Sequence, residues 1–222
     1  MSWLDDERLE RDPQRVQEPD EEPEDEDEEE DEERKSTDED ERLAEKVLKT
    51  RTILISEAIT DEVARRVFQQ LLVLEAEARD KPITLIINSP GGEADSGFGI
   101  FDMLRFVAPP VRTLVAGLCA SAAVIVFLAG EKGQRLSLPH SRFMMHQPSS
   151  ASFGQASDLQ IASAEIVRLR ERYNRIVADM IGKDVDVVRR DADRDFWLTA
   201  GEACEYGLVD RTVQRREEVE QS

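Results

Sequence analysis

Ser121 and the two histidines of the chain are the residues whose types best suit nucleophilic catalysis. A serine hydroxyl attacks a carbonyl at neutral pH when a neighbouring base, most often an imidazole, takes its proton. His146 ends the apolar segment FMMH, whereas His140 follows Pro139 in a predicted loop. Because α/β folds carry reactive groups at the carboxyl ends of strands, His146 is the stronger candidate for the base.

Ser121 lies in the small-residue segment GLCAS, where a predicted strand gives way to a helix. A hydroxyl there is close to the positive end of the helix dipole, and small neighbours leave room for a substrate backbone. The segment matches neither the G-x-S-x-G turn of α/β-hydrolases nor a Ser-x-x-Lys pair, because Val124 stands three residues on. Cys119 is the competing nucleophile, although a free cysteine is more typically a small buried core residue.

Gly91 and Gly92 follow Ser89-Pro90 between a predicted strand and a helix. Paired glycines accept positive φ and can expose consecutive N–H groups, which would form an oxyanion hole or an anion-binding nest. An ordinary turn can have the same sequence. The glycines therefore support acyl-transfer chemistry only together with Ser121 and His146.

The elements that must position these residues follow from the hydrophobic pattern. Apolar runs of strand length alternate with segments of helical periodicity, which predicts an α/β fold. The predicted strands cover residues 51–55, 83–88, 111–116, 135–138, 142–146, 196–198 and 209–213. The predicted helices cover residues 41–48, 60–79, 98–106, 121–129, 157–181 and 186–190, with one more beginning at residue 200.

The longest predicted helix covers residues 157–181 and should end at Gly182, since glycine suits the left-handed conformation after a helix. Its apolar residues form one stripe, which must pack either within the subunit or against another copy. The stripe consists of Leu159, Ala162, Ile166, Leu169, Tyr173, Ile176, Val177 and Met180. In the helix over residues 60–79, Thr60 is the predicted N-cap.

Composition excludes several classes of protein. The chain has no lysine and arginine cluster of the kind that neutralises nucleic-acid phosphates. Its two cysteines and two histidines lack metal-ligand spacing, so we expect no metal site. The N-terminal residues have no basic and apolar pattern of a secretory signal, which makes a cytoplasmic location the expectation.

A segment of 18 uncharged residues, Thr113 to Gly130, is at the length threshold for a membrane span. Its character changes midway, from β-branched residues through a small-residue turn to a helix-like run. A buried strand, turn and helix explain this change better, so no membrane association is predicted.

Charge is concentrated at the N-terminus. The net charge is −20, and the first 40 residues contain 22 of the 49 acidic residues but only five of the 29 basic ones. From Glu18 to Glu33, 14 of 16 residues are acidic and the other two are prolines. Such a run repels itself and has nothing apolar to bury. We therefore predict a disordered acidic extension over residues 1–40, followed by one domain over residues 41–222.

Four sequence blocks in register carry a resemblance to a known family. They read ITLIINSPGG, GLCASAA, LPHSRFMMHQP and RRDADRDFWLTAGEACEYGLVD. In this order, and with His146 lying 25 positions after Ser121, they resemble the proteolytic subunits of the caseinolytic Clp protease, the ClpP family. The resemblance covers about Lys46 to Gln214. It implies the ClpP/crotonase-like fold of stacked strands and helices, with the long helix as a protruding handle.

The resemblance also implies roles for individual residues. Ser121 would be the nucleophile of a serine endopeptidase, His146 the general base, and Asp195 the acid that orients the imidazole. The backbone N–H groups of Gly92 and Ala122 would form the oxyanion hole. From the sequence alone, the neighbouring acids of DADRD, Asp191 and Asp193, remain competitors for the role of Asp195.

Several positions depart from the family pattern. Ala122 replaces the methionine that commonly follows the serine, and Cys119 replaces a common alanine. Glu93 follows the SPGG block where an apolar residue is common, which could alter substrate binding beside the oxyanion hole. The acidic run takes the place of a short loop that gates the axial pore. It would be either a solubilising extension or a polyanionic plug that disfavours acidic substrates.

The resemblance further implies an assembly and partners. Two seven-membered rings of this chain would enclose the catalytic sites, and an AAA+ unfoldase would use ATP to feed in unfolded proteins. Two alternatives stay open. One is a non-catalytic or weakly active ring subunit that partners an active paralogue, and the other is a crotonase-like enzyme acting on acyl-CoA.

Overall fold

The computed structural model describes residues 40, 42–149 and 153–220. Apart from Asp40, the predicted acidic extension over residues 1–40 lies outside the described residues, and its boundary stays a prediction. Contacts within the chain divide it into two units, Met1–Ala44 and Glu45–Ser222. The second unit contains all the strands found among the described residues, together with the site predicted above.

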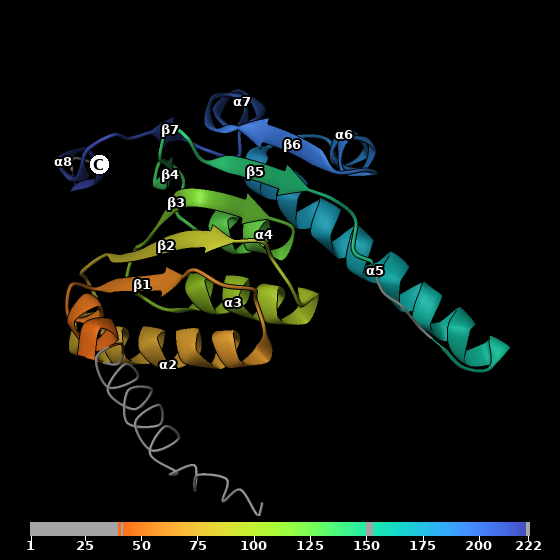
Figure 1. Cartoon of the computed structure of the whole chain (residues 1–222), viewed down its shortest axis with the longest axis horizontal. Coiled ribbons are helices and arrows are strands. Elements are labelled where there is room, and N and C mark those ends of the chain that lie inside the picture. The colour runs from red at the N-terminus through yellow and green to blue at the C-terminus, as the bar shows by residue number, and fades with distance from the viewer. Residues whose placement is uncertain (1–39, 41, 150–152, 221–222) are drawn as a thin grey trace, which may run out of the picture. The chain divides into compact units, whose positions relative to one another are not determined.

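A seven-stranded sheet forms the centre of the second unit and confirms the α/β fold (Figure 1). Five strands follow the order β1-β2-β3-β4-β7 and are parallel, while β5 pairs in parallel with β3 and antiparallel with β6. The strands are β1 (Thr52–Ile55), β2 (Ile83–Ser89), β3 (Val111–Ala120), β4 (Arg135–Ser137), β5 (Arg142–Met145), β6 (Phe196–Thr199) and β7 (Arg211–Thr212).

Helices cover this sheet and extend beyond it. Helices α2 and α3 lie along β1 and β2, whereas α5 runs outward from the body (Figure 1). The labelled helices are α2 (Asp61–Glu77), α3 (Ala94–Phe106), α4 (Ala122–Leu128), α5 (Ala156–Ile181), α6 (Val185–Asp191), α7 (Ala200–Tyr206) and α8 (Arg216–Glu220). Residues 42–48 are helical as well, within the short helix predicted over residues 41–48. In the described part of the chain no helix is both long and apolar enough to cross a membrane.

Strand β3 is longer than its sequence predicts, because it pairs with two different strands on one side. Residues Thr113–Val115 pair with β4, and Leu118–Ala120 pair with β5. Gly117, at φ +114°, separates the two halves, and the side chain of Asn88 accepts a hydrogen bond from Leu118 N at 3.0 Å. The predicted strand end at Ala116 is therefore wrong. Pairing with β5 keeps the LCA residues extended, which local sequence does not reveal.

The predicted helix caps are confirmed. Thr60 Oγ1 accepts a hydrogen bond from Val63 N at 3.3 Å, and Gly182 ends α5 at φ +70°. Helix α3 begins at Ala94, four residues before its predicted start. The predicted strand over residues 209–213 is reduced to Arg211–Thr212, and α8 was not predicted from the sequence.

The apolar stripe of α5 is buried only in its C-terminal half. Tyr173 and Val177 of the stripe are buried against the core, whereas Leu159 is exposed. Ile161 and Val167, which lie outside the predicted stripe, are exposed on the same half of the helix. Because α5 projects away from the sheet, the described part of the subunit does not cover these N-terminal residues (Figure 1).

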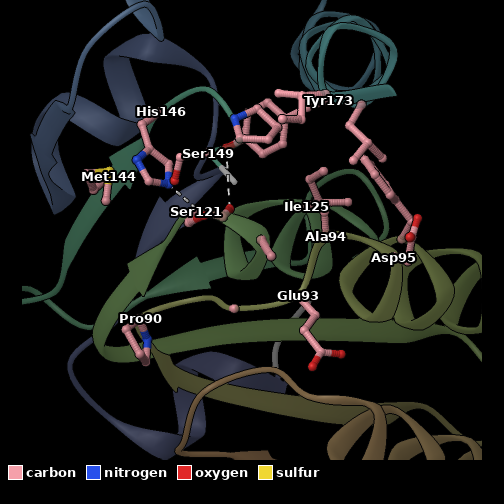
Figure 2. A pocket seen from close by; sticks show the side chains of 16 residues that line it. Pro90, Glu93, Ala94, Asp95, Ser121, Ile125, Met144, His146, Ser149 and Tyr173 are labelled. Atoms are coloured by element: carbon pink, nitrogen blue, oxygen red, sulfur yellow. Dashed lines mark hydrogen bonds between the residues drawn. The ribbon is translucent and has the colours of Figure 1, made fainter. Parts of the chain in front are cut away.

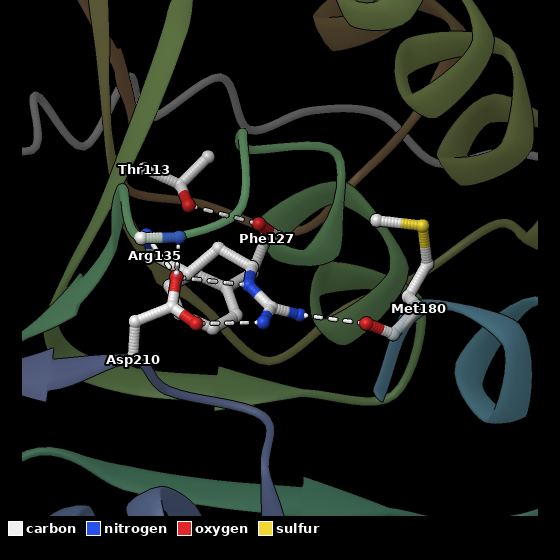
Figure 3. Close-up of polar contacts among 6 residues, drawn as sticks. Thr113, Phe127, Arg135, Met180 and Asp210 are labelled. Carbon is white, nitrogen blue, oxygen red and sulfur yellow. Dashed lines mark hydrogen bonds and ion pairs between the residues drawn. The ribbon is translucent and has the colours of Figure 1, made fainter. Parts of the chain in front are cut away.

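A buried ion pair joins the C-terminal end of α5 to the sheet (Figure 3). Arg135 on β4 is 4% exposed, and its Nη2 lies 2.7 Å from Oδ1 of Asp210, just before β7. Arg135 Nη1 also donates to the carbonyl of Met180 at 3.1 Å. Burial alone would raise the pKa of Asp210, but the hydrogen bonds from Arg135 and Gly133 and the Arg135 charge outweigh it and lower that pKa.

Candidate active site

Ser121 is held at a sharp turn between β3 and α4. Its N–H donates to the carbonyl of Met144 at 2.8 Å, and its backbone has φ +56° and ψ −123°. A serine in this region is strained, and such strain is stable only where the surroundings fix the backbone. The pairing of β3 with β5 fixes it here. A strained strand-to-helix turn also presents the nucleophile of α/β-hydrolases, although the sequence pattern differs.

His146 lies beside Ser121 because each follows the end of one of two paired strands. Strand β5 ends at Met145, and its pairing with β3 aligns Met144 with Ala120. His146 Nε2 lies 2.9 Å from Ser121 Oγ (Figure 2). This is hydrogen-bond distance, and it suits an imidazole that takes the hydroxyl proton. The other histidine, His140, does not line the pocket that contains Ser121 and His146, and lines a separate one instead.

Asp195 is the acidic residue beside His146. Its Oδ1 lies 3.4 Å from His146 Nδ1. The two competitors have other partners, since Asp191 Oδ2 accepts from Tyr206 Oη at 2.8 Å and Asp193 contacts Gln147. The geometry therefore brings Asp195, and neither Asp191 nor Asp193, to the imidazole.

Gln147 is a residue of the site that the sequence analysis did not single out. Its amide donates to the backbone carbonyl of Asp193 at 2.8 Å, and its oxygen accepts from Arg170 on α5 at 3.3 Å. Gln147 thereby ties α5 to the loop that carries Asp195. Its position directly after His146 was the only sequence signal for this role.

Cys119 lies in the core, although it is two residues before Ser121. The residue is 0% exposed, and burial raises the pKa of its thiol. A thiol that stays protonated and has no access to solvent is not a nucleophile. The sharp turn at Ser121 explains why Cys119, still within β3, cannot share its position.

Gly91 and Gly92 approach the start of α4 from the end of β2. Both have positive φ, +87° and +154°, and a Cβ at Gly91 would lie 2.9 Å from Ala122 N. A Cβ at Gly92 would lie 2.2 Å from the carbonyl of Ile59, so only glycine fits. Among the described residues, neither Gly92 N nor Ala122 N donates a hydrogen bond to another backbone carbonyl. The N–H groups of Gly92 and Ala122 can therefore donate hydrogen bonds to an oxyanion that forms near Ser121.

A pocket of about 570 Å³ opens beside these groups (Figure 2). Its walls come from the segment after β2, from α3, from α4, from the end of β5 and from α5. Tyr173 on α5 reaches the carbonyl of Ser121 at 3.4 Å, and burial raises the pKa of this phenol, which therefore stays a donor. Other lining residues include Pro90, Glu93, Asp95, Phe98, Ile125, Met144, Ile166 and Leu169.

Comparison with known proteins agrees with the resemblance seen in the sequence. The family model described as Clp protease matches residues 34–216, most of the chain. The chain belongs to the Clp protease family. One relative is the "ATP-dependent Clp protease proteolytic subunit 2" of Parasynechococcus marenigrum, to which this chain is 46% identical over 171 residues. The matched region is 77% of this chain and 87% of that protein.

Other members of the Clp protease family are similarly related. The corresponding subunit 2 of Treponema denticola is 41% identical over 183 residues, covering 82% of this chain and 92% of that protein. A solved structure, a point mutant of ClpP1 from Listeria monocytogenes, superposes with a TM-score of 0.74 at 41% identity, covering 80% of this chain and 99% of that one. The ClpP-like fold predicted from the sequence is thus confirmed, and the chain is a Clp-type protease subunit by family.

Proposed function

We propose that the chain is a serine endopeptidase subunit that cleaves peptide bonds by acyl transfer. The proposal depends on two consecutive contacts of a Ser-His-Asp arrangement. Ser121 Oγ lies 2.9 Å from His146 Nε2, and His146 Nδ1 lies 3.4 Å from Asp195. Ser121 and His146 line a pocket large enough for substrate side chains, which Gly92 and Ala122 also line.

Each group then has a defined task. His146 Nε2 takes the proton of Ser121 as Oγ bonds to the peptide carbonyl carbon, while Asp195 stabilises the imidazolium. The N–H groups of Gly92 and Ala122 donate to the oxyanion. His146 next gives the proton to the leaving amine, and the acyl-enzyme forms. Water activated by the same imidazole releases the acyl group and restores Ser121.

Covalent labelling tests this mechanism. A fluorophosphonate should label the wild-type protein at Ser121, as read by mass spectrometry of peptides, and the Ser121→Ala variant should stay unlabelled. Cys119→Ala is the matched control, because it removes the competing nucleophile from the core and should keep the label. Labelling that persists in Ser121→Ala would contradict the proposal. Assembly without labelling or peptide hydrolysis would favour the non-catalytic subunit, and hydration of an acyl-CoA the crotonase-like enzyme.

The same proposal includes a chamber and a partner. Unfolded proteins would reach Ser121 inside two seven-membered rings, fed by an AAA+ unfoldase that hydrolyses ATP, while this subunit needs no cofactor. Membership of the Clp protease family and the exposed apolar residues of α5 support this assembly. Native mass measurement tests the ring size. Degradation of an unfolded protein with and without a Clp ATPase and ATP tests the partnership.

A further inference from the structure

The pocket beside Ser121 has an unusual charge for a site whose other side chains are mainly apolar. Two carboxylates, Glu93 and Asp95, line it, and no lysine or arginine of the described residues does. Figure 2 shows both on the opposite side of Ser121 from His146.

Neither carboxylate is neutralised by a described basic side chain. Glu93 Oε2 accepts a hydrogen bond from Ser96 Oγ at 2.9 Å, which leaves the charge in place. The nearby Arg172 stacks on the pocket residue Phe98 at 4.1 Å and pairs with Asp102 at 3.5 Å. The two negative charges are therefore available to a ligand in the pocket.

The backbone fixes Glu93 close to the reacting atoms. Glu93 directly follows Gly92, a proposed oxyanion donor, and consecutive Cα atoms are about 3.8 Å apart. Its N–H donates to the carbonyl of Ile59 at 2.9 Å, which anchors this segment on the body of the subunit. A substrate residue near the scissile bond is thus within reach of the carboxylate.

Both acids also lie at the N-terminal end of α3, where Glu93 is the N-cap and Asp95 is in the first turn. Carboxylates there stabilise a helix by complementing its dipole. That contribution would change the stability of α3 but not the choice among substrates. Substrate selectivity therefore separates the two roles.

We propose that Glu93 and Asp95 make this subunit prefer substrates with a lysine or arginine close to the scissile bond. The inference rests on the proposed function, because it assigns a substrate class to the same site. An ammonium or guanidinium group in this pocket would be attracted by the carboxylates that line it, and the attraction there is stronger than in bulk water. A substrate carboxylate at the same position would be repelled.

Matched internally quenched peptides test the preference. In one series a single lysine moves from three residues before to three residues after the cleaved bond, and in a second series neutral citrulline replaces it. At the best position we expect kcat/KM to favour lysine about tenfold in low salt, the size of one or two partly screened ion pairs. The preference should shrink as added salt screens the charges.

Variants identify the source of the preference. In Glu93→Gln and Asp95→Asn the lysine-to-citrulline ratio should fall severalfold, and in Glu93→Lys it should drop below one. Glu77→Gln, which removes an exposed charge outside the pocket, should keep the wild-type ratio. The acidic residues 1–40 are present in every variant, so differences in the ratio between variants do not come from them.

The outcomes are distinct. A wild-type ratio near one, or a ratio that persists in both pocket variants, would overturn this inference and leave the proposed function standing. Absence of both fluorophosphonate labelling and peptide hydrolysis in the wild type would instead overturn the proposed function. Glu93→Lys is a second test that does not depend on the folding of the neutral variants. A lysine-to-citrulline ratio of kcat/KM below one in this variant supports the inference even if its overall activity is reduced.

Discussion

The backbone strain at Ser121 links its position to its chemistry. A positive φ in a non-glycine residue costs of order 1–3 kcal/mol in conformational free energy. The pairing of β3 with β5 holds Ser121 in this strained conformation, which places its Oγ at the pocket. The same turn places Ala122, one of the two proposed oxyanion donors, directly after Ser121 at the start of α4.

Replacing this serine should therefore reveal the stored strain. We expect Ser121→Gly to be more stable than Ser121→Ala by about 1 kcal/mol, because glycine adopts φ +56° without a Cβ clash. The gain is reduced by the greater entropy of glycine in the unfolded chain. Urea unfolding of the two inactive variants measures the difference. Equal midpoints would show that the turn is unstrained.

The three neighbouring aspartates should differ sharply in their effect on hydrolysis. Asp195→Asn should lower kcat for a short peptide by about 10²–10⁴, since the imidazole loses the charge that stabilises its protonated form. Asp191→Asn and Asp193→Asn are matched controls and should each lower it less than about tenfold. A loss in Asp193→Asn as large as in Asp195→Asn would move the assignment to the other residue.

At the scale of elements, the forked pairing of β3 assembles the site. The first half of β3 aligns with β4 and the second with β5, so Ser121 and His146 emerge from paired strand ends. Gly117 permits the change of partner, because a Cβ there would lie 2.6 Å from Asn88 Oδ1. The Arg135–Asp210 pair then fixes β4, the start of β7 and the end of α5 relative to one another.

Breaking this ion pair should loosen all three elements. Asp210→Asn should lower the free energy of unfolding by about 3–5 kcal/mol at pH 7, because it leaves Arg135 buried without its charge partner. The folded-state pKa of Asp210 is lowered, so its stabilisation is present above the unfolded pKa of about 3.9 and is lost as pH falls through the folded value. Urea unfolding at a series of pH values checks this.

The contribution of the Asp210 charge to the free energy of unfolding is the difference between wild type and Asp210→Asn at each pH. Wild type and Asp210→Asn should differ most near neutral pH, and the difference should narrow as the pH falls below about 4. Glu77→Gln, which removes an exposed carboxylate, should follow the wild-type curve. A difference that stays constant down to low pH would mean that the charge of Asp210 does not contribute.

At the scale of the whole molecule, α5 leaves apolar surface uncovered. Ile161 is 64% exposed and Val167 is 45% exposed, on the half of the helix that runs beyond the sheet. Exposed apolar residues grouped on one element commonly mark an interaction surface. A second copy of the subunit is the partner that the proposed rings supply.

Charges on that surface should therefore reduce the size of the assembly. The double variant Ile161→Asp and Val167→Asp should shift the native mass to smaller species and lower peptide hydrolysis at least tenfold, because burying a carboxylate at an apolar interface is costly. Arg175→Glu alters charge at an exposed polar position of α5 and should leave the native mass unchanged. An unchanged mass in the double variant would exclude this surface from the interface.

Local sequence determined much of this protein. The alternation of strands and helices, the cap at Thr60, the end of α5 at Gly182 and the candidate pair Ser121 and His146 follow from residue types and spacing. These features depend on interactions within a few residues, which the sequence displays directly.

Tertiary structure decided the rest. The extension of β3 to Ala120, the core position of Cys119, the contact of Asp195 with His146 and the link through Gln147 depend on segments 20 or more residues apart. Three aspartates spaced two residues apart have the same chemistry. Only the packing of the loop after α6 against β5 determines which of them lies beside the imidazole.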